Sequence, residues 1–134
     1  ESILKEGKLI LFELAPIDPR SLMQGDYMAL RYSIMDTIRN MELPKRGFIV
    51  IRPDSLNVAR YVRIQKGKEL PESNEQRIEF SASFNHLSIG ASSFFFEEGN
   101  AGKYEKAKYG GIKVDMKGNS VLTGLYDENR IRID

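Results

Sequence analysis

Apolar and polar residues alternate with a period of two in several segments along this chain, and that pattern restricts the folds open to it. In residues 77–84, Ile78 and Phe80 alternate with charged or hydroxyl-bearing residues, of which Arg77 is the first, and we expect these polar side chains to face solvent. Successive side chains of a β-strand point to opposite faces, so this pattern predicts a strand with one face in a core. Gly118-Asn119 predicts a two-residue hairpin turn. Similar alternating or short apolar runs predict further strands at residues 8–14, 25–34, 47–51, 58–64, 89–96, 112–117, 120–126 and 130–133.

Helix signals are few and short. Asp36 is placed to cap a helix that ends before Pro44, and Asn100 to cap one that runs to Lys108 with Gly110 as its stop. Neither exceeds about three turns, which is too short for a helix that stands alone. Both helices would therefore have to pack against a sheet to be stable.

The length of 134 residues suits one domain. We therefore predict a single domain over residues 1–134, all-β in the main. The alternating runs favour a barrel-like or sandwich core of about eight strands with one or two short helices, and they do not separate barrel from sandwich. The sequence starts with Glu1 rather than Met, which predicts that a preceding segment has been removed.

Composition narrows the function. Twenty Lys and Arg against nineteen Asp and Glu leave a net charge of +1, which argues against a dedicated nucleic-acid binder because such proteins carry a concentrated basic excess. The absence of cysteine excludes disulfides, thiolate zinc sites and thiol catalysis. We expect no metal, no cofactor and no nucleic-acid partner. The composition does not indicate whether the protein is a monomer or an oligomer.

The segment 16–27 is the first candidate site. Pro16 and Pro19 fix the backbone on either side of two residues and make a stiff, non-helical connection. Gly25 then permits a turn into the strand that begins near Tyr27.

Two readings of this loop stay open. In the functional reading, it presents Asp18, Arg20 and Asp26 to a ligand. In the structural reading, Asp18 and Asp26 accept backbone N–H groups and Arg20 pairs with one of them, which is the commoner use of Asp in turns.

Residues 25–32 read G-D-Y-M-A-L-R-Y and fit the pattern G-D-Y-x-x-L-x-Y at every fixed position. The lead-in P-I-D-P-R-S-L at residues 16–22, the string F-F-F-E-E-G at 94–99 and the pair Tyr104-Glu105 extend the likeness. On these residues the chain resembles the GDYXXLXY family of bacterial proteins. We take Pro16, Pro19, Gly25, Leu30 and Tyr32 as the structural positions of the motif.

The family resemblance mostly implies a location. Family members typically carry an N-terminal membrane helix followed by an extracytoplasmic domain, and their molecular function is not established. The resemblance therefore implies a periplasmic-side domain whose anchor lies outside this sequence.

Three carboxylates suggest an alternative. If Glu98 ends a strand and Glu105 follows on a helix, both side chains would converge with Asp26 and serve as acid, base or cation ligands. In the structural alternative, Glu98 pairs with a nearby arginine and Glu105 is solvated, and this is the commoner outcome for acids beside basic residues.

Serine catalysis finds no support. His86 is the sole histidine, and the sequence contains no G-x-S-x-G elbow. Residues 19–26 are also similar to the P-T-L-x-x-G-D stretch of the signal-peptidase family. Ile17 takes the place of that family's nucleophilic serine, so a serine–lysine mechanism has no nucleophile.

Three hypotheses follow. The first is a non-enzymatic, membrane-tethered extracytoplasmic domain that binds a partner protein or envelope component through Asp18, Arg20, Asp26 and Tyr27, together with Glu98 and Glu105. The second is a hydrolase that uses Asp26, Glu98 and Glu105. In the third, the motif is purely structural and the binding surface lies elsewhere.

Overall fold

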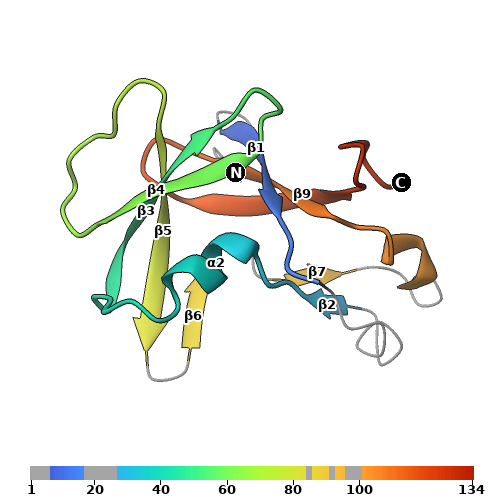
Figure 1. Cartoon of the computed structure of the whole chain (residues 1–134), viewed down its shortest axis with the longest axis horizontal. Coiled ribbons are helices and arrows are strands. Elements are labelled where there is room, and N and C mark those ends of the chain that lie inside the picture. Colours follow the sequence, from blue (N-terminus) through green and yellow to red (C-terminus); the bar gives the residue numbers. More distant parts are fainter. Residues whose placement is uncertain (1–6, 17–26, 84–85, 91–92, 96–100) are drawn as a thin grey trace.

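The computed structural model describes residues 7–16, 27–83, 86–90, 93–95 and 101–134, and the chain is mostly β (Figure 1). The prediction of a mainly all-β fold is confirmed. The described part contains one α-helix, α2 (Ser33–Ile38), and one 3-10 turn, Ala101–Tyr104. Its strands are β1 (Lys8–Glu13), β2 (Tyr27–Ala29), β3 (Arg46–Pro53), β4 (Ala59–Gln65), β5 (Gln76–Ser83), β6 (His86–Ile89), β7 (Ser93–Phe95), β8 (Tyr109–Val114) and β9 (Ser120–Tyr126).

The strands pair antiparallel in sheets of order β1-β8-β9 and β4-β3-β5-β6, and β2 pairs with β7. The two larger sheets touch along one edge through a parallel bridge between Leu11 and Val58. There, the backbone N–H of Leu11 donates to the carbonyl oxygen of Asn57 at 2.9 Å. Beyond that bridge β4 has no strand on its free edge, so the described strands do not form a closed barrel.

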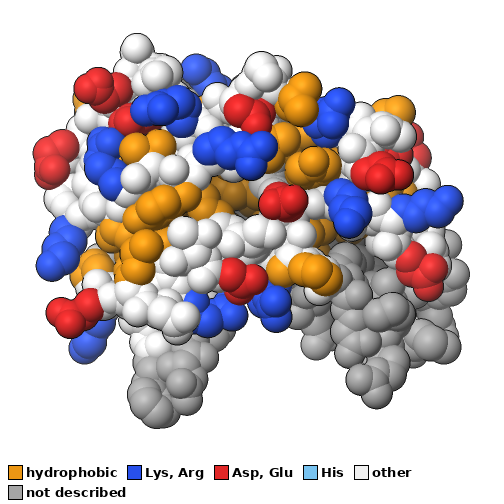
Figure 2. Space-filling model, in the orientation of Figure 1, with side chains coloured by type: hydrophobic (Ala, Val, Ile, Leu, Met, Phe, Trp, Pro, Cys, Tyr) orange, Lys and Arg blue, Asp and Glu red, His pale blue; other side chains and the backbone are white. Residues whose placement is uncertain are grey.

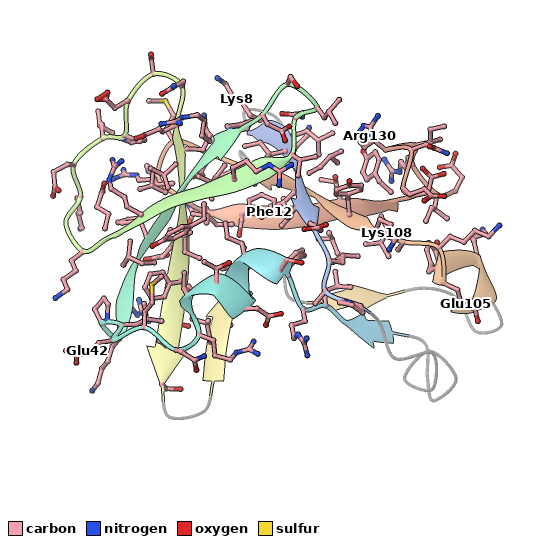
Figure 3. The ribbon with its side chains drawn as sticks, viewed as in Figure 1. Lys8, Phe12, Glu42, Glu105, Lys108 and Arg130 are labelled. Atoms are coloured by element: carbon pink, nitrogen blue, oxygen red, sulfur yellow. The ribbon has the colours of Figure 1, made fainter. Side chains whose placement is uncertain are left out.

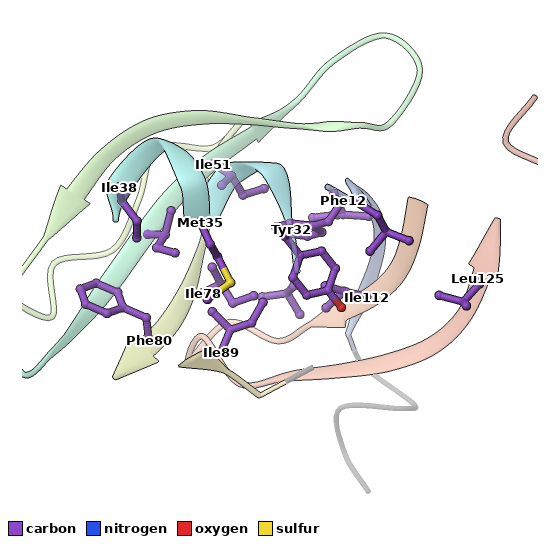
Figure 4. Close-up of a cluster of buried hydrophobic side chains, with 14 of the residues drawn as sticks. Phe12, Tyr32, Met35, Ile38, Ile51, Ile78, Phe80, Ile89, Ile112 and Leu125 are labelled. Atoms are coloured by element: carbon purple, nitrogen blue, oxygen red, sulfur yellow. The ribbon is translucent and has the colours of Figure 1, made fainter. Parts of the chain in front are cut away.

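One core joins the sheets and the helix (Figure 4). The alternation predicted for β5 places Ile78 and Phe80 on the inner face, and the apolar run of β3 places Ile49 and Ile51 beside them, where each is at most 1% exposed. Burying such side chains is the main source of stability in a domain of this size. The other fully buried large residues are Ile10, Phe12, Tyr32, Ile38, Val50, Ile112 and Leu125.

The predicted strand 25–34 is wrong over its second half. The chain leaves the extended conformation and α2 begins at Ser33, three residues before the expected cap Asp36. Met35 and Ile38 are both buried. A spacing of three residues puts two side chains on one face of a helix but on opposite faces of a strand, so burying both favours the helix.

Three further expectations are corrected. The single strand expected at 89–96 is divided between β6, which pairs with β5, and β7, which pairs with β2. The helix expected at 100–108 is reduced to the 3-10 turn Ala101–Tyr104, and the chain is non-helical from residue 105 until β8 begins at Tyr109. The strand expected at 130–133 is a single bridge between Tyr126 and Arg132.

The turn between β8 and β9 is longer than the predicted two residues. It spans 115–119, and the carboxylate of Asp115 accepts the backbone N–H of Asn119 at 2.9 Å. Gly118 has φ +95°, which favours glycine. Met116 therefore lies in the turn and is exposed, where the alternation had placed it on a strand.

The loop at 66–75 is held onto the outer face of the larger sheet by buried polar side chains. The amide of Gln65 donates to the carbonyl oxygen of Glu69 at 2.8 Å. Arg77 was expected to face solvent but is buried, because its guanidinium donates to the carbonyls of Glu69 and Met116, each at 3.2 Å. The same guanidinium lies 4.6 Å from the ring centre of Phe48. Arg77 thus fastens this loop and the β8–β9 turn to the sheet.

Candidate functional site

Most of the residues predicted to form a site lie outside the described part of the chain. These are Asp18, Pro19, Arg20, Gly25, Asp26 and Glu98. Tyr27 begins β2, but its side chain and that of His86 are also outside the description. The structure therefore does not test whether Asp26 and Glu98 converge, and both the loop-binding hypothesis and the hydrolase hypothesis stay predictions.

Two residues of the predicted set are described and exposed. Pro16 lies just after β1, and Glu105 follows the 3-10 turn and points into solvent (Figure 3). Among the described residues, no group of three or more His, Cys, Asp or Glu side chains is close enough to hold a metal ion.

The end of the G-D-Y-x-x-L-x-Y pattern lies in the core. Tyr32 is fully buried, and Leu30 is partly buried against the same cluster. Gly110 makes room for the ring, because a Cβ at that position would lie 3.0 Å from Cε1 of Tyr32. Burial raises the pKa of the Tyr32 phenol, so the side chain stays neutral. These positions suit a role in folding.

Asp54 organises the turn between β3 and β4. One carboxylate oxygen accepts the backbone N–H groups of Leu56 at 2.8 Å and Val58 at 3.0 Å, and the other accepts Nε of Arg60 at 2.9 Å. The hydrogen bond from Val58, assisted by those from Leu56 and Arg60, lowers the pKa of Asp54. This carboxylate is committed to a structural turn.

Glu75 is the most deeply placed of the described carboxylates that form ion pairs, with its side chain 4% exposed. Its two oxygens accept Nη1 and Nη2 of Arg63, each at 3.1 Å, in a bidentate pair. The hydrogen bonds from Arg63, and then the backbone N–H of Glu72, lower the pKa of Glu75. Arg52 lies 3.7 Å away on the same side. These contacts close the loop at 66–75 over the sheet.

A surface that the sequence did not indicate lies where the sheets are open. Inner-face side chains of β4 remain partly exposed there, and Figure 2 shows hydrophobic side chains gathered in a band over this face. Met41 is 41% exposed and lies 3.8 Å from the hydroxyl of Tyr61. We call this surface the β4–α2 band, made of Ile34, Met41, Leu43, Ala59, Tyr61 and Ile64.

Sequence reasoning missed this band for a physical reason. The sequence predicted β4 but not which segments would pack over its inner face, because that depends on contacts between parts of the chain that are far apart in sequence. Tyr61 in an alternating strand was the one local signal.

Comparison with known proteins gives a single finding. The family model described as GDYXXLXY protein matches residues 1–125. No curated protein and no solved structure matches the chain.

Proposed function

Since the chain belongs to the GDYXXLXY protein family, we propose that it is a membrane-tethered, extracytoplasmic domain that binds a partner protein and performs no catalysis itself. The location follows from the family resemblance, in which a membrane helix precedes the domain. No helix within the described residues is long and apolar enough to cross a membrane. The proposed tether is a segment outside this sequence.

The observation that carries the binding proposal is the β4–α2 band. Contiguous exposed apolar surface on a soluble domain commonly marks an interaction site. Tyrosine and methionine are enriched at the buried centres of protein interfaces, and Tyr61 and Met41 lie in contact in the band. The band therefore offers an anchor of the kind that dominates binding energy.

The surroundings of the band suit a protein partner. Figure 2 shows Lys, Arg, Asp and Glu side chains around the hydrophobic side chains of this face, so charged groups rim the apolar surface. An apolar centre with a polar rim is the usual anatomy of a protein interface. The free edge of β4 adds backbone groups that a partner's extended segment would pair with.

Site-specific photo-crosslinking in the producing cells tests the binding. A crosslinking amino acid replaces Met41 in one protein and, in a control, Leu56, which is also exposed and is not part of the band. We expect a discrete adduct from position 41 that is absent from position 56 and lost when Tyr61→Glu is added. Adducts of equal intensity from both positions, or none from position 41, would contradict the proposal.

A separate measurement tests the location. Enzyme reporters that work only outside, or only inside, the cytoplasm are fused to the C-terminus of the protein as the cell makes it. Activity of the outside reporter alone is expected, and activity of the inside reporter alone would refute the extracytoplasmic assignment while leaving the crosslinking result standing.

A further inference from the structure

A polar groove of about 250 Å³ crosses the outer face of the sheet β4-β3-β5-β6, away from the β4–α2 band. Arg46, Ser81 and Ser88 are direct cross-strand neighbours on β3, β5 and β6. Directly paired residues of adjacent strands project from the same face, so these three side chains form a row across the sheet. Glu79 also lines the groove, and it lies two residues before Ser81 on β5, on the same face of the sheet.

The two serines provide a hydrogen-bonding floor. Ser81 Oγ and Ser88 Oγ are 3.0 Å apart, and either one can be the donor. Each hydroxyl has one hydrogen, so one hydrogen forms the bond between the two serines and the other remains available for donation. The floor therefore offers one free donor and several acceptor lone pairs to a ligand.

Two opposite charges face this floor without neutralising each other. Arg46 and Glu79 line the same groove, yet neither forms an ion pair with any residue that the structure describes. They are diagonal neighbours on paired strands, a separation of about 7–8 Å between Cα atoms. By contrast, Arg52 and Arg63 on the same sheet form ion pairs with Glu75, and Arg60 forms one with Asp54. The groove thus holds a cation and an anion that form no ion pair with a described residue, and Ser81 is a neighbour of both.

We propose that this groove binds a sugar acid, a single ring that carries one carboxylate among its hydroxyl groups. The planar fork of Arg46 matches a carboxylate. Glu79, an acceptor only, takes hydrogen bonds from ring hydroxyls, and it disfavours a phosphate group because phosphate carries close to two negative charges at pH 7. A volume of about 250 Å³ is slightly below the range of about 300–1,000 Å³ that is typical of ligand pockets, which suits a ligand of about one ring. This inference is independent of the partner-binding proposal.

The test is a titration of the whole chain followed by two-dimensional NMR of its backbone amides. The probes are glucuronate, glucose, acetate and inorganic phosphate, each raised to tens of millimolar. We expect glucuronate to shift the amides of Ser81, Ser88 and Gly90 with a dissociation constant of about 1 mM, and the other three to bind at least about tenfold more weakly. Glucose that binds as well as glucuronate overturns the proposal, because the carboxylate would then contribute nothing. Acetate that binds as well overturns it too, because the ring hydroxyls would then contribute nothing.

Variants assign the roles. Arg46→Gln should weaken glucuronate binding about tenfold or more, which is the usual value of a hydrogen bond to a charged group. Arg130→Gln is the matched control, since Arg130 is exposed and forms no ion pair with a described residue, and it should change nothing. Glu79→Gln should strengthen phosphate binding relative to glucuronate. Unchanged glucuronate binding by a folded Arg46→Gln protein overturns the site.

Discussion

The ring of Tyr32 lies edge-on to the ring of Phe12, with centroids 6.0 Å apart and planes inclined at 72°. Both side chains are at most 1% exposed. Phe12 comes from β1 and Tyr32 directly precedes α2, and a bridge between Leu14 and Tyr32 joins the same two segments. The last tyrosine of the family pattern therefore fixes the helix to the smaller of the two main sheets.

Replacing Tyr32 should destabilise the domain strongly. Tyr32→Ala removes a fully buried ring and leaves a cavity, for which we expect a loss of about 3–5 kcal/mol in the free energy of unfolding. Tyr32→Phe keeps the ring and should cost much less. Urea denaturation measures both, with the exposed Leu56→Ala as a control that stays within about 0.5 kcal/mol of the parent. A loss below about 1 kcal/mol for Tyr32→Ala would show that Tyr32 is not important for the stability of the domain.

A side chain at Gly118 should destabilise the folded domain. Its φ of +95° is unfavourable for other residues, and a Cβ would lie 2.8 Å from Cε1 of Phe48. We expect Gly118→Ala to lower the free energy of unfolding by about 1–3 kcal/mol. Gly102→Ala is the control, because a Cβ there has open space within 4 Å and should have little effect. Thermal unfolding of the two variants side by side decides it, and equal melting temperatures would count against the strained turn.

Glu75 should contribute to the acid sensitivity of the domain. Arg63 lowers the pKa of Glu75 in the folded state, so its contribution to stability is fully present above the ordinary glutamate pKa of about 4.3. That contribution is lost as the pH falls through the lower, folded value. Denaturant unfolding from pH 7 down to pH 2 should show a shallower decline for Glu75→Gln than for the parent. Glu128→Gln, at an exposed position, is the control, and a parallel decline in all three proteins would contradict the prediction.

Arg77 should hold the loop at 66–75 in place against the sheet. Arg77→Lys loses the planar fork that bonds Glu69 and Met116, and we expect a fall of about 2–3 kcal/mol in stability. Hydrogen exchange should accelerate first in that loop and in the β8–β9 turn. Arg130→Lys serves as the exposed comparison. Faster exchange spread evenly over the whole chain would show that Arg77 does not act on these two segments.

Parts of the site were open to prediction and parts were not. The sequence indicated that Leu30 and Tyr32 were structural positions, and both contact the core. It could not indicate the β4–α2 band, because the exposure of Tyr61 depends on which segments pack over the inner face of β4. It also could not indicate the row of Arg46, Ser81 and Ser88, since residues from three strands meet only through their register.

Local sequence patterns were enough to predict the β character of this protein and the positions of β1, β3, β4, β5 and β9. The pattern is a continuous apolar run in β1 and β3 and an alternation of apolar and polar residues in β5, and each is local to its strand. The tertiary structure decided where α2 begins, how 89–96 is divided, and why Arg77 is buried on a face expected to be polar. Each of these depends on contacts between segments far apart in the chain, and a local pattern carries no information about which segments become neighbours.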